Sequence, residues 1–381
     1  MSDPTFLAYV IITGLGFLLV LVPLPWHLRS GNVGTCLFML WTAFASVFAV
    51  VNSFSWHKNT RDRVPVWCDI SVHLMLSFAT AIPASLFCIA RQLYAITRVS
   101  AIQITAAQRC RDRKIDVVIG LCLPILQMPL QFIVQTRRYD IFEDIGCQPA
   151  IANTIPSYPL VLLWPTILCI LSACYCLFIL RTFIARRFEL SKSLSSDFQS
   201  GTNPYLRLIL LASTIFVLGL PICGYMLYLS LAQPGELVPY SWATIHADFP
   251  RVQEVPASVW RYNSNIRMSV EIYRWAVPCC SWVFFLFFGL SEEARKHYKS
   301  SYRRVVEASC RRNAAKKPQR PPRYVITARC VSPLHDSVAQ TAFAFNRIPH
   351  ESTASNKPHQ LHAYIGYHLQ YLRQAYHPFQ S

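Results

Sequence analysis

Charged residues are scarce in this chain. Asp, Glu, Lys and Arg make up 14% of its 381 residues and hydrophobic residues make up 53%, whereas a soluble globular chain carries about 25% charged residues. The mean hydropathy is positive, at +0.30. Seven intervals of 17 or more residues contain no charged residue: 4–28, 30–57, 70–90, 117–136, 145–180, 208–235 and 275–291.

These intervals have about the length of membrane-spanning helices. A helix crosses the hydrocarbon core with roughly 20 mostly apolar residues, because each residue rises about 1.5 Å. The alternation of polar and apolar residues typical of a membrane barrel is missing. A large soluble protein with buried helices is the alternative, but seven such helices could not all be buried in a chain of this length. The sequence therefore predicts an all-α integral membrane protein, built as a seven-helix transmembrane bundle.

Basic residues are absent before the first apolar interval, where Asp3 is the only charged residue, so this segment does not resemble a cleavable signal peptide. We counted Lys and Arg in the segments that connect or follow the predicted helices. Every second segment, from the loop after the first helix to the segment after the seventh, contains one, six, five and fifteen of these residues. The other segments contain none, three, two and three. The positive-inside rule makes the first set cytoplasmic. We expect an extracellular amino terminus and a cytoplasmic carboxy terminus. The net charge of +17 then reflects topology and contact with membrane lipids, and no nucleic-acid partner is predicted.

Cysteines are rare in the predicted outer loops. Of fourteen cysteines, only Cys68 and Cys147 fall there. Disulfides persist on the oxidising side of a membrane, so we expect these two to pair and to hold the loop before helix five over the mouth of the bundle. The alternative is two free thiols.

Ionisable groups are nearly absent from the middles of the intervals, which argues against several classes of protein. No lysine in 268–291 is available for a retinal Schiff base. A transporter usually carries midplane charges and an internal repeat, and neither is seen. An enzyme requires a convergent set of His, Asp or Glu, and His73 is alone in the third helix. We predict no catalytic residues, no cofactor and no metal site.

A receptor requires an inner surface that a partner protein can bind. Arg91, Tyr94 and Arg98 follow helical spacing and form one stripe at the inner end of helix three. Arg186 and Arg187 end helix five. We expect these five residues to serve coupling, although basic residues that bind lipid headgroups and fix topology are the alternative.

A receptor also requires an outer pocket and helices that can repack. Candidate ligand-binding residues lie in helix three and near the outer ends of helices five to seven: His73, Tyr158, Trp164, Tyr225, Tyr228, Glu271, Arg274 and Trp275. For the aromatic residues the alternative is an interfacial belt, and for Glu271 and Arg274 it is a local ion pair. Gly219, Pro221 and Pro278 are candidate hinges, because an internal proline removes a backbone hydrogen bond.

The chain divides into three parts. Residues 1–290 form the predicted transmembrane domain, and 291–309 follow the pattern of a short amphipathic helix on the inner leaflet. Residues 310–381 are rich in Pro, Ser, Gln and basic groups and predict a mostly disordered cytoplasmic tail. The tail histidines lack zinc-site spacing.

Five short motifs are distinctive in combination: Trp67-Cys68-Asp69, Ile89 to Tyr94, Leu220-Pro221, Trp275 to Pro278, and Phe284 to Ala294. They resemble motifs of fungal mating-pheromone receptors of the a-factor receptor type, a class of G-protein-coupled receptors. The resemblance covers roughly residues 5–300.

The resemblance implies a plasma-membrane receptor for a carboxy-terminally prenylated peptide pheromone, which activates a heterotrimeric G protein and a mating response. A homodimer is a further expectation. The chain departs from the family in one motif, because Arg91 is followed by Gln92 where two adjacent basic residues are usual. A receptor-like paralogue without a mating role, and a small-solute transporter or channel, remain alternatives.

Overall fold

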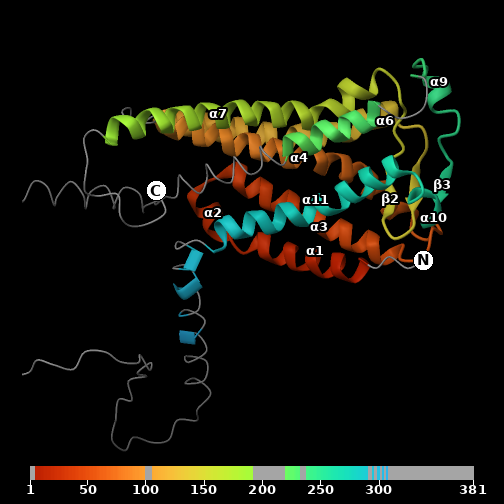
Figure 1. The fold of residues 1–381 in the computed structure, drawn as a ribbon, viewed down its shortest axis with the longest axis horizontal. Coiled ribbons are helices and arrows are strands. Elements are labelled where there is room, and N and C mark those ends of the chain that lie inside the picture. The colour runs from red at the N-terminus through yellow and green to blue at the C-terminus, as the bar shows by residue number, and fades with distance from the viewer. Residues whose placement is uncertain are drawn as a thin grey trace, which may run out of the picture. The chain divides into compact units, whose positions relative to one another are not determined.

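The computed structural model describes residues 5–98, 105–191, 219–231 and 237–290, together with 294–295, 298–300, 303 and 306–307. The predicted tail, 310–381, and much of the predicted amphipathic helix, 291–309, lie outside these residues. Figure 1 shows long helices that run side by side over the described part of the first 316 residues.

Within the described residues, six helical segments are long and apolar enough to cross a membrane. They comprise α1 (Phe6–Leu21) with α2 (Leu24–Ser30), α3 (Val33–Ser55), α4 (Pro65–Arg98), α5 (Ala106–Val117) continuing into α6 (Leu123–Val134), α7 (Leu163–Ser191), and α11 (Ser264–Phe288). Single π-helical turns, Val118–Cys122 and Tyr158–Leu162, precede α6 and α7. A shorter apolar helix, Gly219–Leu231, lies in the sixth predicted interval, whose remaining residues are outside those described.

Helix α4 packs against α3, α6 and α7, and α1 packs against α3 and α11. Small residues allow close approach between membrane helices. At Gly34, in α3, an added Cβ would lie 2.9 Å from Cβ of Cys88 in α4. A buried cluster that includes Phe38, Met39 and Phe284 fills the space between α1, α3, α4 and α11.

A small three-stranded sheet covers one end of the bundle (Figure 1). Its central strand β1 (Tyr139–Phe142) pairs antiparallel with β2 (Gly146–Gln148) and parallel with β3 (Val252–Val255). Two short helices, α9 (Trp242–Ile245) and α10 (Ala257–Trp260), flank β3. We call the segment 135–157 together with 237–263 the cap, and the end that it covers the disulfide end. The opposite end, where Arg91 lies, is the basic end.

The structure differs from the sequence predictions in two respects. The chain is mostly helical but not all-α, because the cap contains a sheet. Helix α11 begins at Ser264, well before the charge-free interval 275–291, so Glu271 and Arg274 lie inside a helix and not at its entrance.

Candidate functional site

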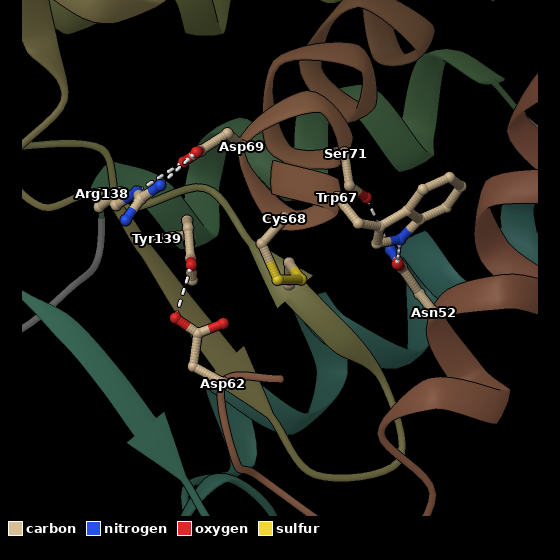
Figure 2. Close-up of a disulfide and its surroundings, with 9 residues drawn as sticks. Asn52, Asp62, Trp67, Cys68, Asp69, Ser71, Arg138 and Tyr139 are labelled. Atoms are coloured by element: carbon tan, nitrogen blue, oxygen red, sulfur yellow. Dashed lines mark hydrogen bonds and ion pairs between the residues drawn. A yellow bond between two sulfur atoms is a disulfide. The ribbon is translucent and has the colours of Figure 1, made fainter. Parts of the chain in front are cut away.

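A disulfide fastens the cap to the bundle. Cys68, in the first turn of α4, is bonded to Cys147 in β2, with their Cα atoms 5.4 Å apart (Figure 2). Both residues are fully buried, in a cluster with Trp56, Val72 and Tyr139. This is the pair that the sequence predicted.

Polar contacts reinforce this attachment (Figure 2). Arg138 donates two hydrogen bonds to the carboxylate of Asp69 in α4, at 2.8 and 2.6 Å. The Tyr139 hydroxyl donates to Asp62 at 2.8 Å. Burial raises the pKa of the Tyr139 hydroxyl, and its hydrogen bond to Asp62 acts in the same direction. The hydroxyl therefore remains a neutral donor at physiological pH.

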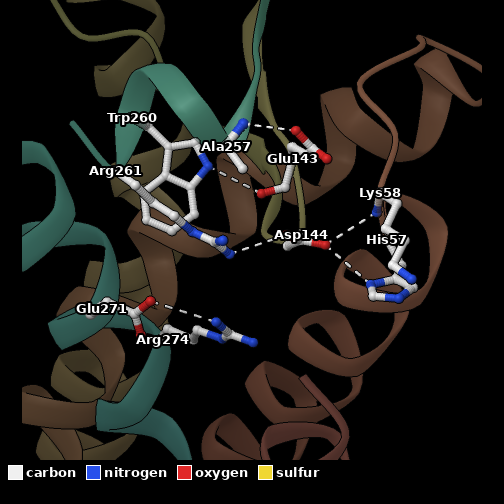
Figure 3. Close-up of polar contacts among 9 residues, drawn as sticks. All are labelled: His57, Lys58, Glu143, Asp144, Ala257, Trp260, Arg261, Glu271 and Arg274. Atoms are coloured by element: carbon white, nitrogen blue, oxygen red, sulfur yellow. Dashed lines mark hydrogen bonds and ion pairs between the residues drawn. The ribbon is translucent and has the colours of Figure 1, made fainter. Parts of the chain in front are cut away.

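Asp144 connects three segments at the disulfide end (Figure 3). Its fully buried carboxylate lies 3.1 Å from His57 Nδ1, accepts from the Lys58 backbone N–H at 3.1 Å, and pairs with Arg261 at 3.1 Å. The neighbouring Glu143 accepts from the backbone N–H of Ala257 at 2.7 Å. These contacts hold together the loop after α3, the β1–β2 turn and the segment 257–261, which contains α10.

A cavity of about 300 Å³ lies in the bundle beneath the cap. Residues from α1, α3, α4, α7, Gly219–Leu231 and α11 line it, and Ile145 and Gln148 of the cap close one side. Apolar side chains predominate in its walls, among them Phe48, Met75, Phe78, Ile82, Met226 and Tyr273. The cavity is therefore suited to a largely apolar ligand.

Arg274 supplies a cationic group to the wall of this cavity. It is only 5% exposed, and its guanidinium lies 3.6 Å from Glu271 (Figure 3). The guanidinium also lies 4.4 Å from the centre of the Tyr9 ring. Trp275 donates to Glu271 at 3.2 Å, and its ring contacts Tyr9 edge-on. Glu271 and Arg274 form the local pair considered from the sequence, and Arg274 also faces the cavity.

The other proposed ligand-binding residues do not line this cavity. His73 and Trp164 each have a buried ring nitrogen without a hydrogen-bond partner among the described residues. The Tyr158 hydroxyl donates to Asn153 at 2.8 Å. Tyr225 and Tyr228 are 39% and 61% exposed.

Sequence reasoning missed several lining residues. Tyr9 and Asn52 line the cavity from α1 and α3. No pattern in the sequence indicates that either residue lies close to helix seven. Ile145 and Gln148 could have been found, because they flank the cysteine whose pairing was predicted.

Arg91 is held by two acids at the basic end. Its guanidinium donates to Asp116 Oδ1 at 2.7 and 3.1 Å, to Asp112 Oδ1 at 3.2 Å, and to the Asp112 carbonyl at 2.8 Å. The exposed fractions of the three side chains are 17% for Arg91, 5% for Asp116 and 33% for Asp112. We call this set the Arg91 clamp, and it joins α4 to α5.

The remaining coupling and hinge candidates are located as follows. Tyr94 packs edge-on against Tyr175 of α7, at 5.3 Å between ring centres. Arg98, Arg186 and Arg187 lie in α4 and α7, but their side chains are outside the described part of the structure. Gly219 lines the cavity, Pro221 lies two residues further on, and Pro278 is buried within α11.

Among the described residues, no group of three or more His, Cys, Asp or Glu side chains could hold a metal ion. The candidate site consists of the apolar cavity, the buried Arg274 in its wall and the disulfide-bonded cap above it. The Arg91 clamp lies at the opposite end of the bundle.

Comparison with known proteins relates this chain to pheromone receptors of fungi. A family model described as "Pheromone A receptor" matches residues 8–307. The pheromone B alpha 1 receptor of Schizophyllum commune is 37% identical over 309 residues, 81% of this chain and 48% of the relative. Pheromone receptor 1 of Mycosarcoma maydis is 31% identical over 76% of this chain and 82% of the relative. The pheromone a factor receptor of Saccharomyces cerevisiae is 24% identical over 76% and 60%. The chain spans about half the length of the Schizophyllum commune receptors that it matches.

Proposed function

The chain belongs to the pheromone A receptor family, and on this premise we propose that it is a G-protein-coupled receptor for a prenylated peptide pheromone in a fungal mating response. It is a multi-pass protein of the plasma membrane. The observation that carries the proposal is that the family match, over residues 8–307, includes every residue that lines the cavity.

The disulfide end faces the outside in this proposal, and the basic end faces the cytosol. The positive-inside count supports this orientation, and so does the Cys68–Cys147 bond, because disulfides persist in an oxidising compartment. The amino terminus is then extracellular, since Phe6, at the start of α1, stacks on His57 at the disulfide end.

The cavity receives the lipidated part of the pheromone. Burial of a prenyl chain contributes about 0.8 kcal/mol of binding free energy per methylene group. The cavity provides this burial because its wall is mostly apolar. The Arg274 guanidinium donates hydrogen bonds to carbonyl oxygens of the peptide, which fixes the polar part of the ligand at the cavity wall.

The Arg91 clamp stabilises the packing of the unliganded receptor. Its four hydrogen bonds use four of the five N–H groups of the guanidinium, so another protein that binds Arg91 competes with the closed clamp. Pheromone favours a packing in which the clamp opens and the G protein binds at the basic end. By linkage, the G protein then tightens pheromone binding by the same factor.

The test is nucleotide exchange on a heterotrimeric G protein reconstituted with the full chain and a panel of prenylated peptides. Exchange that depends on one of these peptides, and is lost with its unprenylated form, supports the proposal. Failure of every peptide to stimulate exchange or to bind, with a folded receptor, would favour a receptor-like paralogue. Solute uptake or current without a G protein would favour the transporter or channel.

A further inference from the structure

An aromatic cluster lies on the surface at the disulfide end. Phe132, near the end of α6, packs edge-on against Phe249, with ring centres 5.3 Å apart. It also lies 6.0 Å from Trp242 and 5.5 Å from His246. Trp242 and His246 are stacked at 3.9 Å. We call these four residues the aromatic cluster. It remains accessible, since Trp242 is 52% exposed and Phe132 is 41% exposed.

Hydrogen bonds hold the cap segment that carries α9 against the end of α6. The last carbonyl groups of a helix have no partner within the helix and accept from other groups. The Tyr240 hydroxyl donates to the Ile133 carbonyl at 3.2 Å, and His246 Nε2 lies within hydrogen-bond distance, 3.0 Å, of the Phe132 carbonyl oxygen. Trp242 therefore lies at the level of the α6 terminus, where the membrane-spanning segment Ala106–Val134 ends.

The cluster continues the lipid-facing side of that segment. Val118, Leu121, Ile125 and Phe132 recur at helical spacing and are 57%, 36%, 48% and 41% exposed. The opposite side is polar and buried, with Gln127 and Gln131 exposed by 1% and 0%. An apolar stripe on a membrane-spanning helix contacts acyl chains. Aromatic residues placed where such a stripe ends lie at the headgroup level, which amphipathic rings prefer.

We propose that the aromatic cluster inserts into the interface between headgroups and acyl chains of the outer phospholipid leaflet, and so anchors the cap to the membrane. The charged pair of Asp248 and Arg251, at 3.1 Å and about two-thirds exposed, lies on the aqueous side. Arg251 immediately precedes β3, and β3 pairs with β1. The leaflet thereby fixes the height of the sheet over the cavity. This role is independent of the pheromone and of G-protein coupling.

The test measures tryptophan fluorescence of the full chain in phosphatidylcholine nanodiscs that contain lipids brominated at a shallow or a deep acyl position. We compare wild type with Trp242→Phe. The matched control is Trp56→Phe, because Trp56 is 1% exposed and its ring nitrogen has no partner among the described residues. The expected result is that Trp242→Phe loses a component quenched more by shallow than by deep bromine, whereas Trp56→Phe retains it.

Two results would overturn the anchor. If the component removed by Trp242→Phe is quenched by acrylamide in water and not by brominated lipid, the cluster is solvated. If it is shielded from both quenchers, a protein surface covers the cluster, such as a second copy of the chain. Trp242→Tyr is the second variant, and a thermal unfolding curve for each variant separates loss of lipid contact from loss of fold.

Discussion

Asp116 accepts two hydrogen bonds from the Arg91 guanidinium, at 2.7 and 3.1 Å, across the contact between α4 and α5. The Asp116 side chain is 5% exposed, so its charge depends on this partner. Removing one member of such a pair leaves a buried charge unpaired and is strongly unfavourable, even where the intact pair contributes little to stability. The clamp therefore resists any motion that separates α4 from α5 at the basic end.

Asp116→Asn is expected to raise basal nucleotide exchange on the G protein. The amide cannot form the charged contact, so the closed packing loses stability relative to the open one. A loss of about 1.4 kcal/mol changes the ratio of the two packings tenfold. The measurement is exchange without pheromone. Asp248→Asn, in an exposed pair at the opposite end, is the control and leaves exchange unchanged.

Arg91→Ala separates two roles of the arginine. If Arg91 only holds the clamp, the variant behaves as Asp116→Asn does, with raised basal exchange. If the freed arginine also contacts the G protein, both basal and pheromone-dependent exchange fall, and we expect this second result. Exchange indistinguishable from wild type in both variants would remove the clamp from the mechanism.

Cys68→Ser and Cys147→Ser are expected to weaken pheromone binding and to lower the unfolding temperature by similar amounts. The bond closes a loop with a sequence separation of 79 residues, for which chain entropy predicts a stabilisation of about 4.5 kcal/mol. Binding of a labelled peptide and a thermal unfolding curve measure the two effects. The double variant should match either single variant, and Cys174→Ser, an exposed thiol in α7, should match wild type.

The membrane helices could be predicted because the lipid imposes a strong rule on composition. The same rule explains the error at α11. Counting charge-free residues starts the seventh helix only after Arg274, yet this arginine lies over Tyr9 and beside Glu271 in the protein interior, away from lipid. The cap sheet was missed because strands of three or four residues are too short for an alternation pattern. In addition, β1 pairs with β3, which is distant in sequence.

The site was only partly predictable. Cys68 and Cys147 could be paired because topology left no other cysteine on the outer side. Asp116 was overlooked because the positive-inside rule counts basic residues and not the acids among them. Tyr9 and Asn52 reach the cavity through the packing of α1 and α3, which no local pattern in the sequence specifies.

Arg274→Gln is expected to weaken pheromone binding about tenfold or more. A hydrogen bond from a charged donor contributes about 1.5–3 kcal/mol, and glutamine keeps a donor but loses the charge. Titration with a labelled peptide measures the affinity. Arg267→Gln, an exposed position on the same helix, is the matched control. An unchanged affinity in a stably folded Arg274→Gln receptor would mean that the ligand does not contact this arginine.

Gly146→Ala is expected to lower both the unfolding temperature and the affinity for pheromone. Gly146 has φ +102°, a conformation that residues with a side chain rarely adopt, and an added Cβ would lie 2.6 Å from Asn52 Cβ in α3. Backbone strain of this kind costs about 1–3 kcal/mol. Asn52 also accepts from Trp67 at 2.6 Å and donates to Ser71 at 2.8 Å, so a displaced Asn52 disturbs α4 as well (Figure 2). Gly14→Ala, where an added Cβ meets nothing within 4 Å, is the control. Equal unfolding temperatures for the two variants would show that Gly146 in β2 is not packed closely against Asn52 in α3.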